Sequence, residues 1–180
     1  MRKTELAVGT VVLCALLALP AAAQTNCTNT SGSSCSLTNT ASATVGALIS
    51  LDISGLTTTL TNPTSLTLGT DVGVDNGPTF TVKANRDWQL SIKSANATDW
   101  DYAGSLSGVK PIGHLKWSAT SGGTYAALDA VGATLASSAS PTNGAAAAVF
   151  YKTTWAAGFD AASNAPGVYS LPVVFTLSAP

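Results

Sequence analysis

The alternation of apolar and polar residues with period two constrains the fold of this chain more than any other feature. It runs through Val45–Ile53, Phe80–Ala84 and Trp88–Ile92, and again from Tyr169 to Leu177 near the end of the sequence. A strand with one face in a core and the other in water requires this period, and a helix cannot satisfy it. The sequence therefore predicts a framework of strands, the last of which runs almost to the final residue.

Shorter strand-like runs and turn residues separate these segments. We expect further strands at Leu66–Leu68, Leu115–Trp117, Tyr125–Leu128 and Ala146–Trp155, and turns at 71–78 and 164–167. Short strands at regular spacing with Gly, Pro, Asn and Thr between them, and without helical periodicity, indicate an all-β sandwich or barrel. We predict a single immunoglobulin-like antiparallel β-sandwich with a flexible N-terminal arm.

Three local features leave alternatives open or refine this prediction. Phe80–Ala84 and Trp88–Ile92 are either two arms of a hairpin or one bent strand. The alanine-rich stretch 126–139 is interrupted by Gly132 and two serines, so we expect loop and strand there, with a short helical turn near 128–136 as the alternative. Proline cannot donate to a ladder, so Pro172 marks an edge or bulge position.

The first 23 residues have the organisation of a secretory signal. Arg2 and Lys3 precede the apolar stretch Leu6–Leu19, and small residues follow up to Ala23, after which we expect cleavage. A transmembrane anchor is the alternative, but the stretch is shorter than the about 20 residues that span a bilayer. We predict a secreted protein at the cell surface or outside the cell, with the periplasm as an alternative compartment.

Few charged residues occur, and they are scattered. The chain has 8 Lys or Arg and 9 Asp or Glu residues in 180. A protein that binds nucleic acid needs clustered cations to displace counterions from the phosphate backbone. We therefore expect no nucleic-acid partner.

Residues 24–42 are small and polar, which predicts an arm ahead of a sandwich domain that spans residues 43–180. The arm contains Cys27 and Cys35, and export to an oxidising compartment favours their pairing. Such a disulfide would close a short loop and act as a local staple. Free thiols and an intermolecular bridge are the alternatives.

Candidate catalytic residues are few. His114 is the only histidine, and no Gly-x-Ser-x-Gly elbow is present. Asp99 and Asp101 flank Trp100 and could form a glycosidase-type carboxylate pair, although a loop with an aromatic anchor is the preferred interpretation. We expect a non-enzymatic protein with no catalytic residue, no cofactor and no metal site.

The four tryptophans stand out in a chain with 7% aromatic residues. Trp88, Trp117 and Trp155 lie in strand-like runs, so we expect them in the core. Trp100 and Tyr102 lie in a predicted loop and are our candidates for residues that face a ligand, because exposed aromatic rings stack on sugars and anchor interfaces.

Two motifs resemble the WxL family of bacterial surface domains. That family carries a Trp-x-Leu motif in mid-domain and a second motif near its C-terminus. Trp88 and Leu90 match the first motif, and Phe175 and Leu177 stand at the second, with Phe where the family has Trp. The resemblance covers residues 43–180. It implies a secreted β-sandwich held at the cell surface, with peptidoglycan as the expected ligand and the four motif residues acting largely as framework.

The chain also looks like secreted pilin-like and spore-coat-like sandwiches, whose subunits polymerise by lending a strand to a neighbour. Here the polar arm from Gln24 to Ala43, running into the strand at Val45, could serve as that donor. We therefore predict a cell-surface structural or adhesive protein whose partner is the cell wall. A filament subunit that binds identical subunits is the alternative, and a small glycosidase is the least favoured one.

Overall fold

The protein is described from a computed structural model that covers residues 32, 34, 36–37, 39–159 and 163–180. No α-helix occurs among these residues. The elements are β1 (Ile49–Ile53), β2 (Asp71–Ala84), β3 (Trp88–Ser94), β4 (Asp101–Gly104), the 3₁₀ turn η1 (Ile112–His114), β5 (Leu115–Ser118), β6 (Ala126–Ala127), β7 (Ala133–Ser138), β8 (Thr142–Thr154), β9 (Gly167–Ser170) and β10 (Val173–Ser178).

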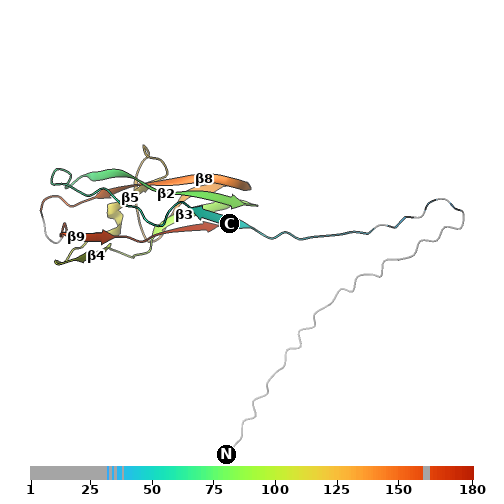
Figure 1. Ribbon diagram of the computed structural model, residues 1–180, viewed down its shortest axis with the longest axis horizontal. Helices are drawn as coiled ribbons and strands as arrows, with labels where there is room; N and C mark the ends of the chain where they lie inside the picture. Colours follow the sequence, from blue (N-terminus) through green and yellow to red (C-terminus); the bar gives the residue numbers. More distant parts are fainter. Residues whose placement is uncertain (1–31, 33, 35, 38, 160–162) are drawn as a thin grey trace, which may run out of the picture. The chain divides into compact units, whose positions relative to one another are not determined.

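The strands form an all-β sandwich (Figure 1). One sheet has the order β1-β2-β8-β5-β6 and a second has the order β10-β3-β7, while β4 and β9 form a separate pair. All pairings are antiparallel. The predicted fold class is confirmed at this level, and the immunoglobulin-like subclass stays a prediction.

The core follows the predicted alternation most closely on β2 and β3. Phe80 and Val82 of β2 and Leu90 and Ile92 of β3 are almost completely buried. The rings of Phe80 and Phe175 join the two larger sheets, with centroids 4.6 Å apart. Burial of such side chains stabilises a fold by about 1.5–3 kcal/mol each, which explains why the sheets pack on these faces.

The corner between β2 and β3 corrects the prediction of a hairpin or a bent strand. Strand β2 belongs to the five-stranded sheet and β3 to the three-stranded sheet, so Asn85–Asp87 carries the chain from one layer to the other. Period-two alternation reports which face is buried and carries no information on which sheet a strand joins. Both alternatives were therefore wrong.

Three other predictions of local structure were also wrong. The run Tyr169–Leu177, predicted as one strand, is divided into β9 and β10, which belong to different sheets. Residues 71–78, predicted as a turn, form the first half of β2, where the register shifts near Gly73 and Gly77. Gly73 has φ +76, a conformation that suits glycine within a bulge. Leu66–Leu68, predicted as a strand, lies in a turn in which Leu66 is 92% exposed.

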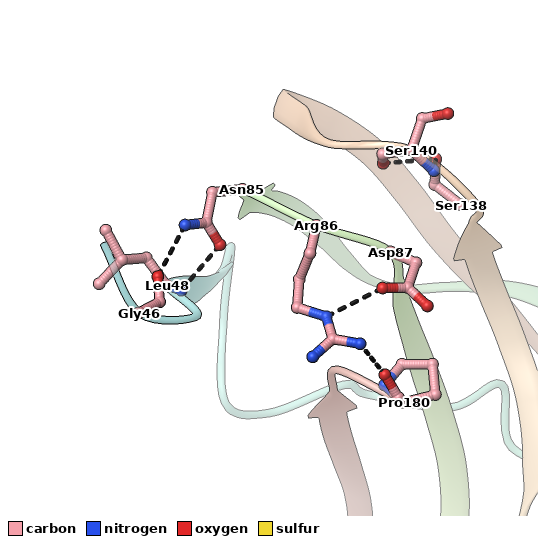
Figure 2. Close-up of polar contacts among 8 residues, drawn as sticks. All are labelled: Gly46, Leu48, Asn85, Arg86, Asp87, Ser138, Ser140 and Pro180. Carbon is pink, nitrogen blue, oxygen red and sulfur yellow. Dashed lines mark hydrogen bonds and ion pairs between the residues drawn. The ribbon is translucent and has the colours of Figure 1, made fainter. Parts of the chain in front are cut away.

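The first strand begins later than predicted, at Ile49. The residues just before it are held by hydrogen bonds to the Asn85 side chain, where a strand would have a ladder of backbone hydrogen bonds (Figure 2). The Asn85 side chain accepts a hydrogen bond from Leu48 N at 2.9 Å and donates one to Gly46 O at 2.8 Å. At the same corner Arg86 bonds to Asp87 at 2.9 Å and donates to the carbonyl of Pro180. The corner therefore fixes both the entry to β1 and the end of the segment that follows β10.

The sandwich lies in the compact unit Val45–Pro180. Of the preceding unit, the described residues are exposed and form no strand. The predicted signal peptide, 1–23, and the predicted Cys27–Cys35 disulfide lie outside the described residues. Within the described part of the chain, no helix has the length and hydropathy needed to cross a membrane.

Candidate functional site

A cleft of about 1190 Å³ opens between an irregular segment that follows β1 and the segment that contains β9. None of the described residues that line it is charged. They are Leu56, Thr57, Thr58, Thr59, Leu60, Thr61, Asn62, Pro63, Thr64, Ser65, Leu68, Trp100, Leu106, Leu115, Thr153, Trp155, Phe159 and 164–172. We call this site the β9 cleft.

The first wall of the β9 cleft is the threonine-rich stretch 56–65. It forms no strand, and it is held by Asp75 of β2. The Asp75 carboxylate accepts hydrogen bonds from Thr61 N at 2.8 Å and from Thr61 Oγ1 at 2.6 Å. A turn at Thr64–Thr67, closed by Thr67 N donating to Thr64 O at 3.0 Å, ends the wall.

The second wall is β9, which pairs with β4 alone among the described strands. Tyr169 of β9 packs on Tyr102 of β4, with ring centroids 4.9 Å apart. The Tyr102 hydroxyl donates to Pro166 O at 2.8 Å, and the Tyr169 hydroxyl donates to Ala165 O at 3.0 Å. Burial and the neighbouring Tyr102 raise the pKa of Tyr169. Each ring is thus held by its contact with the other ring and by the hydrogen bond of its hydroxyl group.

A buried cation lies beneath the floor of the cleft. Lys110 is 1% exposed, and its Nζ lies 3.6 Å from the ring centroid of Trp155 and 5.3 Å from that of Trp100. It donates a hydrogen bond to the carbonyl of Thr154. No carboxylate in the described residues pairs with it, and burial lowers its pKa to about 8. The aromatic rings therefore provide much of the stabilisation of this charge.

Two buried polar atoms at the cleft have no hydrogen-bond partner in the part of the chain that the structure describes: Trp100 Nε1 and Asn164 Oδ1. Trp100 is 7% exposed. The Asn164 amide nitrogen is occupied, since it donates to Ala156 O at 3.0 Å and to Gly158 O at 2.8 Å. Buried polar groups in folded proteins nearly always have partners. The indole N–H of Trp100 and the amide oxygen of Asn164 each lack a hydrogen-bond partner among the described residues.

The rim of the cleft is unusually apolar. Leu56 is 90% exposed, Phe159 85% and Val168 68%, and Leu106 is also exposed. Single exposed apolar side chains are ordinary, but a group of them around one cavity is characteristic of a binding site.

The structure places the two predicted ligand-facing residues in different roles. Trp100 lines the cleft, although it is buried where an exposed ring was expected. Tyr102 does not line the cleft and supports Tyr169 from behind. Trp155, which we expected in the core, is half-buried and forms part of the cleft wall.

The four residues of the WxL-like motifs lie on two neighbouring strands and do not line the cleft. Trp88 and Leu90 belong to β3, and Phe175 and Leu177 belong to β10. Leu177 is directly opposite Leu90. The indole of Trp88 donates to Thr142 Oγ1 at 2.9 Å, so its polar atom is satisfied within the fold.

The candidate catalytic residues do not gather in the cleft. Asp99 bridges to Pro111, and Asp101, at the start of β4, accepts a hydrogen bond from Asn96 at 3.2 Å; neither lines the cleft. His114 lies in η1, where burial and then Lys110 and Lys116 lower its pKa. No group of potential metal ligands occurs among the described residues.

Sequence reasoning missed most of the cleft, including Asn164 and the wall 56–65, and it also missed Lys110 beneath the cleft. One signal was available, because the stretch 53–70 has no charged residue and is rich in threonine. Such a stretch predicts a neutral surface. It does not predict which segment lies opposite.

No protein-family model matches the chain, and no curated protein has a significantly similar sequence. The resemblance to the WxL family therefore stays a prediction.

Proposed function

We propose that this chain is an exported, non-enzymatic structural protein of the cell surface whose copies join by strand pairing. One observation carries the proposal: residues 39–48 have the pattern of a strand but form none, and all are exposed. Small apolar residues, Ala41, Ala43, Val45 and Ala47, alternate with Ser42, Thr44 and Gly46, and the segment has no charge. A segment of this kind pairs readily with an open sheet edge.

The sandwich offers such edges. Among the described residues β1 pairs only with β2, and β10 pairs only with β3. Ile49, Ile53 and Val174 on these two strands are exposed. Charged side chains commonly protect edges against pairing, and only Asp52 is charged on these two strands. An added strand would gain backbone hydrogen bonds and cover apolar surface.

The hydrogen bonds between the Asn85 side chain and the backbone of Gly46 and Leu48 support a donor role for the segment 39–48. Because Asn85 holds Gly46 and Leu48, the segment leaves the sandwich at a fixed point. A donor strand anchored in this way loses less freedom on pairing than one on a loose linker.

Electron microscopy of the exported protein tests the proposal. We expect filaments or ladders from the intact protein, and soluble monomers after deletion of residues 24–43. Assembly that is unchanged by the deletion would show that the arm is not the donor. An intact protein that stays monomeric would contradict the proposal as a whole.

Non-covalent attachment to the cell wall is a second candidate. It is supported by the direct pairing of Leu90 with Leu177, which joins the two WxL-like motifs in one ladder. Monomers should then sediment with purified peptidoglycan, and failure to do so contradicts this candidate. A glycosidase using Asp99 and Asp101 is not favoured, because neither carboxylate lies in the cleft.

A further inference from the structure

We infer that the β9 cleft is a binding site for a neutral oligosaccharide. The inference is independent of strand pairing, because it concerns a different part of the sandwich and different residues. It rests on the lining, the two unpartnered polar atoms, the rim and the edges of β9.

The lining matches a ligand that has many hydroxyl groups and no charge. Six threonines, at 57, 58, 59, 61, 64 and 153, line the cleft together with Ser65 and Ser170. Among the described residues, no lining side chain carries a charge that could form an ion pair with a phosphate, a carboxylate or an ammonium group. Burying an unpaired ionic group is costly, so a charged ligand is disfavoured.

The two unpartnered atoms call for complementary partners. Trp100 Nε1 needs an acceptor, and Asn164 Oδ1 needs a donor. A sugar hydroxyl is both donor and acceptor, and it can rotate its hydrogen to suit either atom. Leaving such buried groups unpaired costs about 1–3 kcal/mol each. Neither atom has appreciable accessible surface in this structure, so a saccharide in the cleft would reach them and remove that cost only when the side chains that cover them move aside.

The rim provides the apolar contact that a sugar ring needs. Phe159 is 85% exposed, and no ring contact between it and another aromatic residue of the described chain is present. The C–H face of a pyranose can pack on such a ring, with Leu56 and Val168 beside it. The volume of about 1190 Å³ exceeds the about 300–1,000 Å³ of ordinary small-molecule pockets. The cleft therefore has room for more than one sugar unit.

An extended peptide is the main competitor for the cleft, because β9 has a free edge. That edge is short: β9 has four residues, with Pro166 before it and Pro172 shortly after it. Proline lacks the N–H that a ladder requires. A peptide strand could form few backbone hydrogen bonds here, whereas the edges of β1 and β10 contain no proline.

Titration calorimetry of the exported protein with maltohexaose, cellohexaose and chitohexaose tests the inference. We expect saturable binding of at least one of them in the micromolar to millimolar range. Trp100→Phe removes one N–H donor, so it should weaken binding about three- to tenfold. Trp88→Phe is the matched control: it also removes an indole N–H, but outside the cleft, and should leave the affinity unchanged.

A second pair of variants tests the rim without risk to folding. Phe159→Ala should weaken binding about five- to tenfold through lost ring contact. Val131→Ala, at a residue that is 90% exposed and outside the cleft, should have no effect.

Three results would overturn the inference. They are no binding of any of the three hexasaccharides, equal loss in Trp100→Phe and Trp88→Phe, or displacement of the saccharide by a synthetic peptide of residues 36–48. Filament formation that persists when saccharide binding is absent would overturn this inference and leave the proposed function standing.

Discussion

Two buried tryptophans in this sandwich have opposite relations to their surroundings. Trp88 on β3 donates its indole hydrogen to Thr142 Oγ1, within a ladder that includes Leu90 and Leu177. Trp100, just ahead of β4, is nearly as buried but has no acceptor among the described residues. In the first region, the buried indole N–H has its hydrogen-bond partner within the fold. The second has two buried polar atoms without partners among the described residues, which is rare in a finished fold.

The largest expected effect is a loss of stability on mutation of β3, the strand that contains Trp88. Leu90→Ala removes a fully buried side chain that faces Leu177, so it should lower the free energy of unfolding by about 2–5 kcal/mol. Leu106→Ala, on the exposed rim of the cleft, should change it by less than about 0.5 kcal/mol. Chemical denaturation measures both. Similar losses would erase the contrast between the two regions.

A pH effect follows from the cation beneath the cleft. Burial lowers the pKa of Lys110 from 10.5 to about 8, so between these values the unfolded chain binds more protons than the folded one. Stability contributed by this group should therefore rise from about pH 8 toward pH 10.5. Burial raises the pKa of Tyr151, which opposes the rise above pH 10.

Lys110→Met isolates the lysine in this experiment. The unfolding midpoint of the variant should lack the rise above pH 8, whereas the contribution of Tyr151 remains. A variant whose midpoint follows pH as the unmodified protein does would show that Lys110 titrates normally.

The two tryptophans themselves give a smaller and sharper contrast. Trp88→Phe deletes a satisfied hydrogen bond, whereas Trp100→Phe deletes an unsatisfied donor. Both substitutions replace an indole with a smaller ring, so the difference between their losses of unfolding free energy reports mainly on the hydrogen bond. We expect Trp88→Phe to be about 1 kcal/mol more destabilising in urea unfolding. A reversed order would mean that Trp100 has a partner in the unliganded protein.

The smallest effect is expected at the rim. Phe159→Ala should leave the free energy of unfolding within about 0.5 kcal/mol of the original, because the ring is largely exposed. The same variant should lose saccharide affinity. A stability loss comparable to that of Leu90→Ala would mean that Phe159 belongs to the framework.

The same contrast explains what could be predicted from the sequence. Alternation placed Phe80, Val82, Leu90 and Ile92 in the core, because burial on one face of a strand leaves a period-two record. It could not show that β2 and β3 belong to different sheets. It also misled at 71–78, where turn-forming residues sit in bulges of a continuous strand.

The sequence contains fewer signals for the cleft than for the core. Trp100 was singled out because it lies in a predicted loop, where an exposed ring could face a ligand, yet its ring is buried. Lys110 and Asn164 reach the site through long-range packing, which no local pattern encodes. The uncharged, threonine-rich run before β2 was the one local clue. Its partner, β9, lies about a hundred residues later in the chain.

Ultraviolet resonance Raman spectroscopy of the indole N–H band tests the central claim most directly, since it reports hydrogen bonding at individual tryptophans in monomers and filaments alike. Difference spectra against Trp100→Phe and Trp88→Phe isolate the two bands. We predict that a saturating hexasaccharide shifts the Trp100 band to its hydrogen-bonded position and leaves the Trp88 band unchanged. A Trp100 band that does not move when the saccharide is bound would contradict the account.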